Sequence, residues 1–259
     1  MRALRGLAAV AAVSIVELYR RRDLYVALFL GVVTLIPLAS VNLFGVQGVV
    51  RYLREVSLLL IWLFSIAIAI TTAARQLPAE IEQRTILPLL SKPIRRDEVI
   101  LGKYLGAFAA SGSSLLLFYL GFVVLSGLRE GIWFPSVLPQ AVLLHLSFLA
   151  LLTAAVLFGS VFLTPSGNVS CNALLALGML LFGDKLAGFT RHAQGSARWL
   201  TWAIHWVAPH YEFFDLRLRL VHGWDPLTPG VLGAVLLYCA LYTAALLGGA
   251  VWLFRRKLV

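Results

Sequence analysis

The sequence predicts an all-α, polytopic membrane protein, with six transmembrane helices forming one transmembrane domain over residues 1–259. Its composition predicts this class: 60% of the 259 residues are hydrophobic and only 13% are charged. A soluble globular domain has about 45–50% apolar and about 25% charged residues. So few charged residues could not cover the surface of a soluble enzyme. A chain with so many apolar residues could not stay disordered in water. The length allows about six spans of about 20 residues.

Intervals without Asp, Glu, Lys or Arg locate the spans. Most of them hold one helix of about 20 residues, but the interval 131–183 is long enough for two. The turn-forming cluster at 164–168, Thr-Pro-Ser-Gly-Asn, divides that interval into a helical hairpin. The predicted spans cover residues 24–43, 56–74, 101–127, 138–163, 168–183 and 230–254.

The N-terminal apolar run, 6–16, is too short to span a membrane. Its apolar residues recur at helical spacing on one face: Leu4, Leu7, Ala11, Ile15 and Leu18. The pattern predicts a helix at about 3–22 that lies in the cytoplasmic interface. A secretory signal peptide is disfavoured, because three arginines at 20–22 follow the apolar run directly and no good small-residue cleavage site is present.

Basic residues set the predicted orientation. The formal net charge of +10 would indicate nucleic acid in a soluble protein, but in a membrane protein it reflects loops kept on the cytoplasmic side. With the N-terminus in the cytoplasm, 14 of the 22 Lys and Arg residues are cytoplasmic and 8 are not. We therefore expect a multi-pass protein of the cytoplasmic (inner) cell membrane, with both termini cytoplasmic and no nucleic-acid partner.

Motifs for catalysis and nucleotide binding are absent from the sequence, including G-x-x-x-x-G-K-[ST], G-x-S-x-G, H-E-x-x-H and C-x-x-C. We predict no catalytic residue, no metal and no cofactor bound by this chain. A metal site at His205, His210, Glu212 and Asp215 is disfavoured, because Pro209 interrupts any helix between the histidines and the spacing fits no standard ligand pattern.

Polar residues inside the spans have two interpretations each. His145 lies within the fourth span, where it is either a functional ionisable residue or a neutral imidazole that hydrogen-bonds a neighbouring helix. The third span carries Ser111, Ser113 and Ser114 with Gly106, Gly112 and Gly121. These small residues favour close helix packing, and the alternative is that they line a path.

The cytoplasmic loop at 75–100, after the second span, mixes charged residues with an aliphatic cluster, and Pro88 and Pro93 bound its short helical pieces. A solvated loop would not need the aliphatic residues, whereas a segment that docks into a groove of another protein would. The alternative is an interfacial helix that rests on lipid.

A specific run covers about 30 residues of this loop: Glu80, Arg84-Thr85, Leu89-Leu90-Ser91-Lys92-Pro93, Arg96-x-Glu98, Gly102-Lys103 and Gly106. It resembles the cytoplasmic loop of ATP-binding-cassette (ABC) type-2 permeases. The predicted architecture resembles theirs over nearly the whole chain, with an N-terminal elbow helix, six spans and a long loop before the sixth. Unlike the better-known polysaccharide and multidrug members, the chain has no long N-terminal domain and no fused ATPase.

The resemblance implies the permease subunit of an exporter, not itself an enzyme. Two copies of a separate ATPase subunit would bind ATP and Mg²⁺, and a second permease copy or a related permease would pair with this chain in the lipid. The resemblance places a coupling helix at about Glu80–Ser91. It assigns ATPase coupling to Glu80, Glu82, Arg84, Thr85, Leu89, Leu90, Ser91, Pro93, Arg96, Glu98 and Lys103.

The substrate stays open, although largely apolar spans favour a hydrophobic or lipid-linked substrate over an ion. The alternative function is an ATP-independent membrane-embedded enzyme or assembly factor. An enzyme would need polar or ionisable groups that converge at one depth, and the spans carry no carboxylate.

The loop at 184–229 is rich in aromatic residues and is expected on the outer face. Trp199, Trp202 and Trp206 share one face of a predicted helix at about 197–207, which Pro209 ends. Since Trp and Tyr favour the headgroup level, we expect interfacial or re-entrant elements there, comparable to those of type-2 permeases. The residues predicted to form an outer gate are Trp199, Trp202, Trp206, Phe213 and Phe214. A passive anchor is an equal alternative.

Overall fold

The computed structural model describes residues 9–16, 20, 25, 29, 31, 33, 47–77, 96–130, 133–192 and 195–257. All regular elements in these ranges are helical, which confirms the predicted fold class. Five helices there are long and apolar enough to cross a membrane. The predicted first span, 24–43, lies outside the described residues apart from isolated positions, as does the stretch 78–95.

The described elements follow one another as α3 (Gln47–Ala74), α6 (Arg96–Glu130), α7 (Leu138–Ser160), α8 (Pro165–His192), α9 (Ser196–Val207), the 3₁₀ helix η2 (Tyr211–Phe214), α10 (Arg217–His222) and α11 (Pro229–Lys257). The predicted second to sixth spans coincide with α3, α6, α7, α8 and α11. Residues 9–16 are also helical, within the predicted N-terminal helix.

Helix boundaries follow from local sequence chemistry. A proline lies in the first turn of α7, and prolines open α8 and α11, where the missing N–H has no intrahelical partner to lose. The hydroxyl of Thr164 accepts the N–H of Gly167 at 3.3 Å and so caps the start of α8. Gly223 ends α10 with φ of 64°, the left-handed conformation that glycine adopts without strain. The predicted hairpin turn at 164–168 therefore lies at the start of α8.

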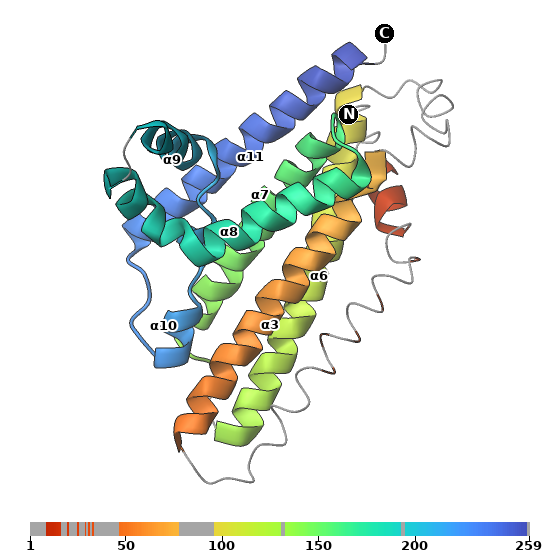
Figure 1. Cartoon of the computed structure of the whole chain (residues 1–259). Helices are drawn as coiled ribbons and strands as arrows, with labels where there is room; N and C mark the ends of the chain where they lie inside the picture. Colours follow the sequence, from red (N-terminus) through yellow and green to blue (C-terminus); the bar gives the residue numbers. More distant parts are fainter. Residues whose placement is uncertain are drawn as a thin grey trace.

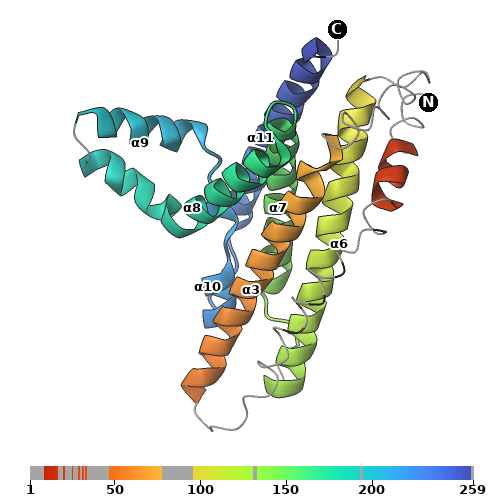
Figure 2. The ribbon, with the colours of Figure 1, turned by 45° about the vertical axis from the view of Figure 1, so that its right-hand side comes forward.

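The helices α3, α6 and α7 pack side by side as the centre of the bundle, and α11 packs along α7 (Figures 1 and 2). We call the end of the bundle at which α3 ends and α6 begins the loop end. There α7 also ends and α8 begins, and the C-terminus of α11 lies at the same end (Figure 1). The stretch 78–95 therefore leaves and re-enters the bundle at the loop end.

The helix α8 is longer than the span predicted for it. The sequence places a loop from residue 184 onward, but the helix continues to His192 and changes direction on the way (Figure 2). Asp184 and Lys185 end the apolar run without ending the helix, because charged residues are compatible with helical backbone. The end of α8 and α9 form a hairpin to the side of the bundle (Figures 1 and 2).

The chain from 208 to 228, which we call the descending segment, runs along the bundle. Near its start, the Val207 carbonyl accepts the hydroxyl of Tyr242, at the middle of α11. At its end, the Gln140 side chain in the first turn of α7 donates to the carbonyl of Leu227 at 3.0 Å and accepts its N–H at 2.7 Å. Tyr242 lies about 20 Å along α11 from Pro229 at 1.5 Å per residue. The sequence predicts all of 184–229 on the outer face, whereas 208–228 extends about 20 Å along α11.

Candidate functional site

At the loop end, Lys103 holds the ends of α3 and α6 together. Its side chain is buried, and its ammonium donates to the carbonyl of Gln76, just past the end of α3, at 3.4 Å. A cation is favourable there, because the last carbonyls of a helix have no intrahelical partner and carry partial negative charge. Leu77 and Ile100 are fully buried beside this contact. Both attachment points of the stretch 78–95 are thus fixed in the bundle.

An ion pair also joins α6 to α11 at this end. Glu98 is buried in the first turn of α6, and Asp97 beside it lies 3.5 Å from the guanidinium of Arg255 on α11. Both Asp97 and Arg255 are partly exposed, so the pair contributes at most about 1 kcal/mol. The pair mainly fixes the relative position of α6 and α11.

The helix at 9–16 packs against α6 through two glycines one turn apart. A Cβ at Gly102 would overlap the side chain of Val10, and one at Gly106 would overlap that of Ser14. Glycines four residues apart allow such close approach between membrane helices. The buried positions are Val10 and Ser14, whereas the apolar face expected to rest on lipid contains their neighbours Ala11 and Ile15, which are half-buried.

The predicted coupling residues fall into two groups. Glu80, Glu82, Arg84, Thr85, Leu89, Leu90, Ser91 and Pro93 lie outside the described residues. Arg96 begins α6, and Glu98 and Lys103 are buried in the first turns of that helix. The two buried residues are therefore positioned to hold α6 and not to meet a partner directly.

In the middle of the bundle, a polar cluster surrounds His145 on α7. Its Nε2 lies 2.8 Å from the hydroxyl of Ser65 on α3, and its Nδ1 lies 3.3 Å from the hydroxyl of Tyr119 on α6. The indole of Trp62, also on α3, stacks on the imidazole with ring centroids 4.0 Å apart. We call these four residues the His145 cluster. They confirm that His145 makes helix–helix hydrogen bonds, the second interpretation of this residue.

The hydrogen-bond partners in the His145 cluster come from three helices. The hydroxyl of Ser65 lies 2.9 Å from the carbonyl of Trp62 on its own helix as well as against the imidazole. An imidazole with one donor and one acceptor nitrogen can bond the hydroxyls of Ser65 and Tyr119 at the same time. A chain of hydrogen-bonded side chains thus runs from α6 through α7 to α3.

The descending segment brings a half-buried ion pair to the same place. The guanidinium of Arg217 makes a bidentate contact with Asp215, with its shortest N–O distance 2.6 Å, and lies 5.5 Å from the centre of the Trp62 ring. A charge at this depth is tolerated because it is paired, and the cation also interacts favourably with the indole face. Trp62 therefore contacts both His145 and Arg217.

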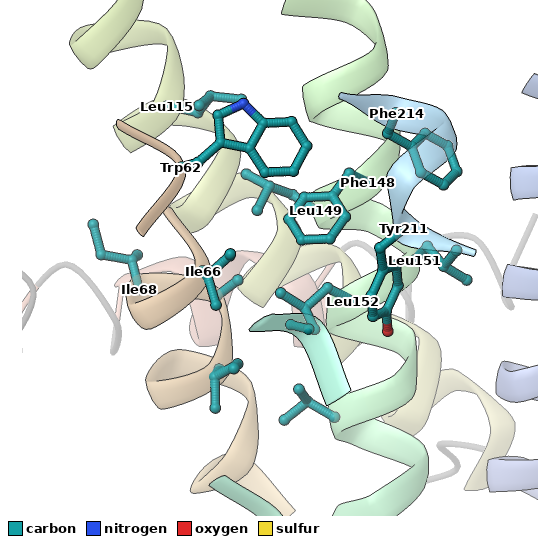
Figure 3. Close-up of a cluster of buried hydrophobic side chains, with 14 of the residues drawn as sticks. Trp62, Ile66, Ile68, Leu115, Phe148, Leu149, Leu151, Leu152, Tyr211 and Phe214 are labelled. Atoms are coloured by element: carbon teal, nitrogen blue, oxygen red, sulfur yellow. The ribbon is translucent and has the colours of Figure 1, made fainter. Parts of the chain in front are cut away.

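Aromatic packing holds η2 against the centre of the bundle. Phe148 on α7 lies between Trp62 and the two η2 residues Tyr211 and Phe214, with ring centroids 4.7, 5.1 and 6.4 Å from its own (Figure 3). Both η2 residues are fully buried. Burial raises the pKa of the Tyr211 hydroxyl, with smaller contributions from Tyr242 and Tyr238, so it stays neutral.

The predicted gate residues are not brought together. Trp199, Trp202 and Trp206 contact one another along one exposed face of α9. Phe214 is buried in the η2 packing, and Phe213 is half-exposed and stacks on His210. The tryptophans thus form a surface, while Phe214 belongs to the core.

The second group of histidines lies where the descending segment begins. His210 contacts Glu212 through Nδ1 at 2.6 Å and the carbonyl of His205 through Nε2 at 2.8 Å. The carboxylate of Glu212 lies against Gly183 of α8, where any Cβ would overlap it. In the described part of the chain, no group of three His, Cys, Asp or Glu side chains is arranged to hold a metal ion.

Sequence reasoning missed Trp62, Ser65, Tyr119 and Arg217. Nothing in their local sequence distinguishes them, because Ser and Tyr occur throughout the spans, and most of the described serine hydroxyls there bond their own helix. Ser111 and Ser114, for example, donate to carbonyls one turn back at 3.0 and 2.8 Å. These two hydroxyls therefore support the packing interpretation of the third span. Only the tertiary arrangement selects Ser65 and Tyr119.

Among the described helices, apolar grooves open on the side of the bundle. One, of about 660 Å³, lies between α7, α8, α11 and the start of the descending segment, and its walls include Phe158, Leu175 and Leu246. Asn172 and Tyr242 are among its few polar residues. Another, of about 560 Å³, lies between α6, α7 and α11.

Residues 1–259 match the family model described as ABC-2 family transporter protein. No curated protein matches the chain.

Proposed function

Because the chain belongs to the ABC-2 transporter family, we propose that it is the permease subunit of an ABC exporter, driven by an ATPase on a separate chain. The observation that carries this proposal is the family match over the whole chain. The firm attachment of α3 and α6 at the loop end supports it, because a loop can move two spans only if both of its ends are fixed to them.

The proposed complex has two ATPase copies, which bind ATP and Mg²⁺, and a second permease, either another copy of this chain or a relative. Closure of the ATPases would pull on the stretch 78–95, and α3 and α6 would follow as rigid bodies. The energy transferred is limited by how differently the two ATPase states bind this stretch.

Within that stretch, Leu89 and Leu90 are proposed to fill a groove of the ATPase, and Glu82 and Arg84 to pair with its charges. The other proposed contacts are Glu80, Thr85, Ser91, Pro93 and Arg96. Docked segments of this kind use apolar anchors for affinity and rim charges for partner choice.

A hydrophobic or lipid-linked substrate fits the chain best. The groove between α7, α8 and α11 is lined almost entirely by apolar side chains, with Asn172 and Tyr242 as polar groups. An apolar chain in this groove would bury its surface against Phe158, Leu175 and Leu246, which is the environment that such chains prefer.

Affinity purification of the tagged chain tests the assignment. We expect an ATPase of the ABC type to copurify, and the Leu89→Asp/Leu90→Asp variant to lose it, since truncating buried interface anchors typically costs about 2 kcal/mol or more. Charge reversal at Glu82 or Arg84 should weaken the association less.

Normal expression and thermal unfolding of the variants would show that the spans are intact. Association unchanged in the double variant would contradict the docking role, and an ATP-independent activity of the isolated chain would favour the alternative enzyme or assembly factor.

The proposed topology places both termini and the stretch 78–95 in the cytoplasm of a cell with a cytoplasmic (inner) membrane. Single cysteines at Ser91 and Asp225, in a background with Cys171 and Cys239 replaced by serine, should react with impermeant maleimide from opposite sides. Asp225 is exposed and lies near the Gln140–Leu227 contact, at the end opposite the loop end. Labelling of both positions from one side would contradict the arrangement.

A further inference from the structure

We propose that the His145 cluster transmits movement of α3 and α6 to the descending segment, with His145 as the positioning residue. This inference rests on the proposed function, in which the stretch 78–95 receives the ATPase movement. It adds a route by which that movement leaves the two helices attached to the stretch. The route consists of contacts whose geometry is known.

The first step is that both helices attached to the stretch 78–95 meet at one imidazole. Ser65 on α3 and Tyr119 on α6 use opposite ring nitrogens of His145. Each ring nitrogen has its own hydroxyl partner, so the imidazole links the two helices directly. A relative displacement of α3 and α6 must therefore lengthen one of these bonds or turn the ring.

The second step is that the ring cannot turn without affecting Trp62. The imidazole and the indole are stacked, with planes 20° apart. Both side chains are buried, so no water can replace a lost contact cheaply. A turn of His145 therefore changes the position of the Trp62 indole or leaves polar atoms of the cluster without partners.

The third step is that Trp62 is where the descending segment meets α3. The guanidinium of Arg217 lies against its ring, and Asp215 neutralises that cation through a bidentate contact. Phe148, which contacts Trp62 directly, holds Tyr211 of the same segment. A shift of the indole therefore acts on the segment at two points, the start of α10 and η2.

The descending segment is suited to respond, because it contains little regular structure of its own. Only four residues of η2 and six of α10 are helical between 208 and 228. Its position depends on side-chain contacts, of which the Arg217 contact and the η2 packing lie at mid-bundle. A segment held in this way can take a second position without unfolding a helix. We therefore identify it as the element that moves.

The experiment measures access to the end of the segment. In the Cys171→Ser/Cys239→Ser background, a reporter cysteine replaces Asp225, whose side chain is exposed and takes no part in the cluster. The permease is purified with its ATPase in lipid nanodiscs, and the rate of maleimide labelling is compared with and without Mg²⁺, ATP and vanadate. With the cluster intact, we expect the rate to change about fivefold, the lower end of typical coupling between sites.

Variants then remove parts of the cluster. His145→Leu removes both hydrogen bonds at similar volume, and Tyr119→Phe or Ser65→Ala removes one hydroxyl and leaves the packing. In these variants we expect the ATPase to stay bound and hydrolyse ATP, while the ATP-dependent change in labelling falls to less than about twofold. Ser147→Ala is the matched control, because this hydroxyl lies on the same helix but bonds only the carbonyl of Leu143.

An ATP-dependent change that persists unaltered in His145→Leu and Tyr119→Phe would overturn the proposal. If no ATPase copurifies with the unaltered chain, the proposed function fails. The labelling rates without nucleotide then still test whether the His145 cluster holds the descending segment in place. Faster labelling of the reporter in His145→Leu than in Ser147→Ala would show that the cluster holds the descending segment. Equal labelling rates in the two variants would show that the cluster does not hold the segment.

Discussion

The spans at the centre of the bundle and those at its side differ in how much of their surface the chain itself covers. In the apolar windows of α3 and α7, 61% and 67% of the residues are buried, against 28% for α8 and 11% for α11. The central helices also carry the buried polar cluster at mid-bundle. The third central helix, α6, has an intermediate value of 44%. The difference indicates that α3 and α7 are covered mainly by other parts of this chain. In contrast, α8 and α11 need lipid or another chain to cover their outer faces.

The space around individual glycines also differs between the centre and the side of the bundle. A Cβ at Gly102, Gly106 or Gly159 would overlap a neighbouring side chain, so these glycines are required by close packing. At Gly178 on α8 and Gly233 on α11, a Cβ would meet nothing within 4 Å. Gly102, Gly106 and Gly159 are therefore contact residues, whereas Gly178 and Gly233 face open surroundings. On the side helices, Gly183 is packed where α8 meets Glu212.

The largest expected effect comes from deleting a central aromatic ring. Phe148→Ala should lower the free energy of unfolding by about 3–5 kcal/mol, because Phe148 is fully buried among Trp62, Tyr211 and Phe214. Leu241→Ala on α11 is the matched control, since that side chain is 64% exposed. Thermal unfolding in detergent measures both. Equal losses would remove the distinction between centre and side.

A smaller loss is expected from filling the space at a packed glycine. Gly102→Leu should destabilise the chain by about 1–3 kcal/mol through overpacking against Val10. Gly178→Leu should be neutral or slightly stabilising, because leucine is favoured over glycine in a helix by up to about 1 kcal/mol and no neighbour is displaced. The opposite signs make thermal unfolding of the pair decisive. Stabilisation by Gly102→Leu would show that residues 9–16 do not pack on α6.

The sequence predicts the fold class and the described spans well, because in a membrane the apolar length of a helix decides where it lies. The hairpin between α7 and α8 follows from its turn residues in the same way. The sequence does not reveal that α8 continues past Gly183 or that the chain after α9 descends along the bundle. The apolar run ends at Asp184, so hydropathy predicts that the span ends there. The path of the chain depends instead on Tyr238 and Tyr242, which lie on a helix about 30 residues further on.

The candidate sites divide in the same manner. His145 could be selected from the sequence, since an ionisable residue inside a long charge-free interval stands out. Its partners Ser65 and Tyr119 could not, because their role comes only from the packing of three helices. The Gly102-x-x-x-Gly106 spacing did carry a readable signal for helix contact, but it does not identify the partner at 9–16.

A third effect should appear where the two regions are joined at the end opposite the loop end. Gln140→Leu removes both hydrogen bonds to the backbone of Leu227, which leaves a partly buried N–H and carbonyl without partners. We expect a loss of about 1–2 kcal/mol and faster labelling of a cysteine at Asp225 by maleimide. Ser147→Ala, on the same helix, should change neither. Unchanged labelling in Gln140→Leu would show that other contacts fix the end of the descending segment.

The smallest effect on stability is expected at the tryptophan face of α9. Tryptophan fluorescence reports there on whether lipid or protein contacts the side of the bundle. Trp202 and Trp206 are 50% and 68% exposed, so Trp202→Phe/Trp206→Phe should leave thermal unfolding nearly unchanged. The sequence predicts this face at the headgroup level, but the end of α9 bonds Tyr242, about 20 Å along α11 from Pro229. We therefore expect these two tryptophans deeper in the membrane. Quenching by lipids brominated near the middle of the acyl chain should exceed quenching by shallow bromines, and the double variant should lose mainly the deep component. A loss confined to shallow bromines would restore the interfacial placement. No loss at any depth would show that protein, such as a second permease, covers this face of the side region.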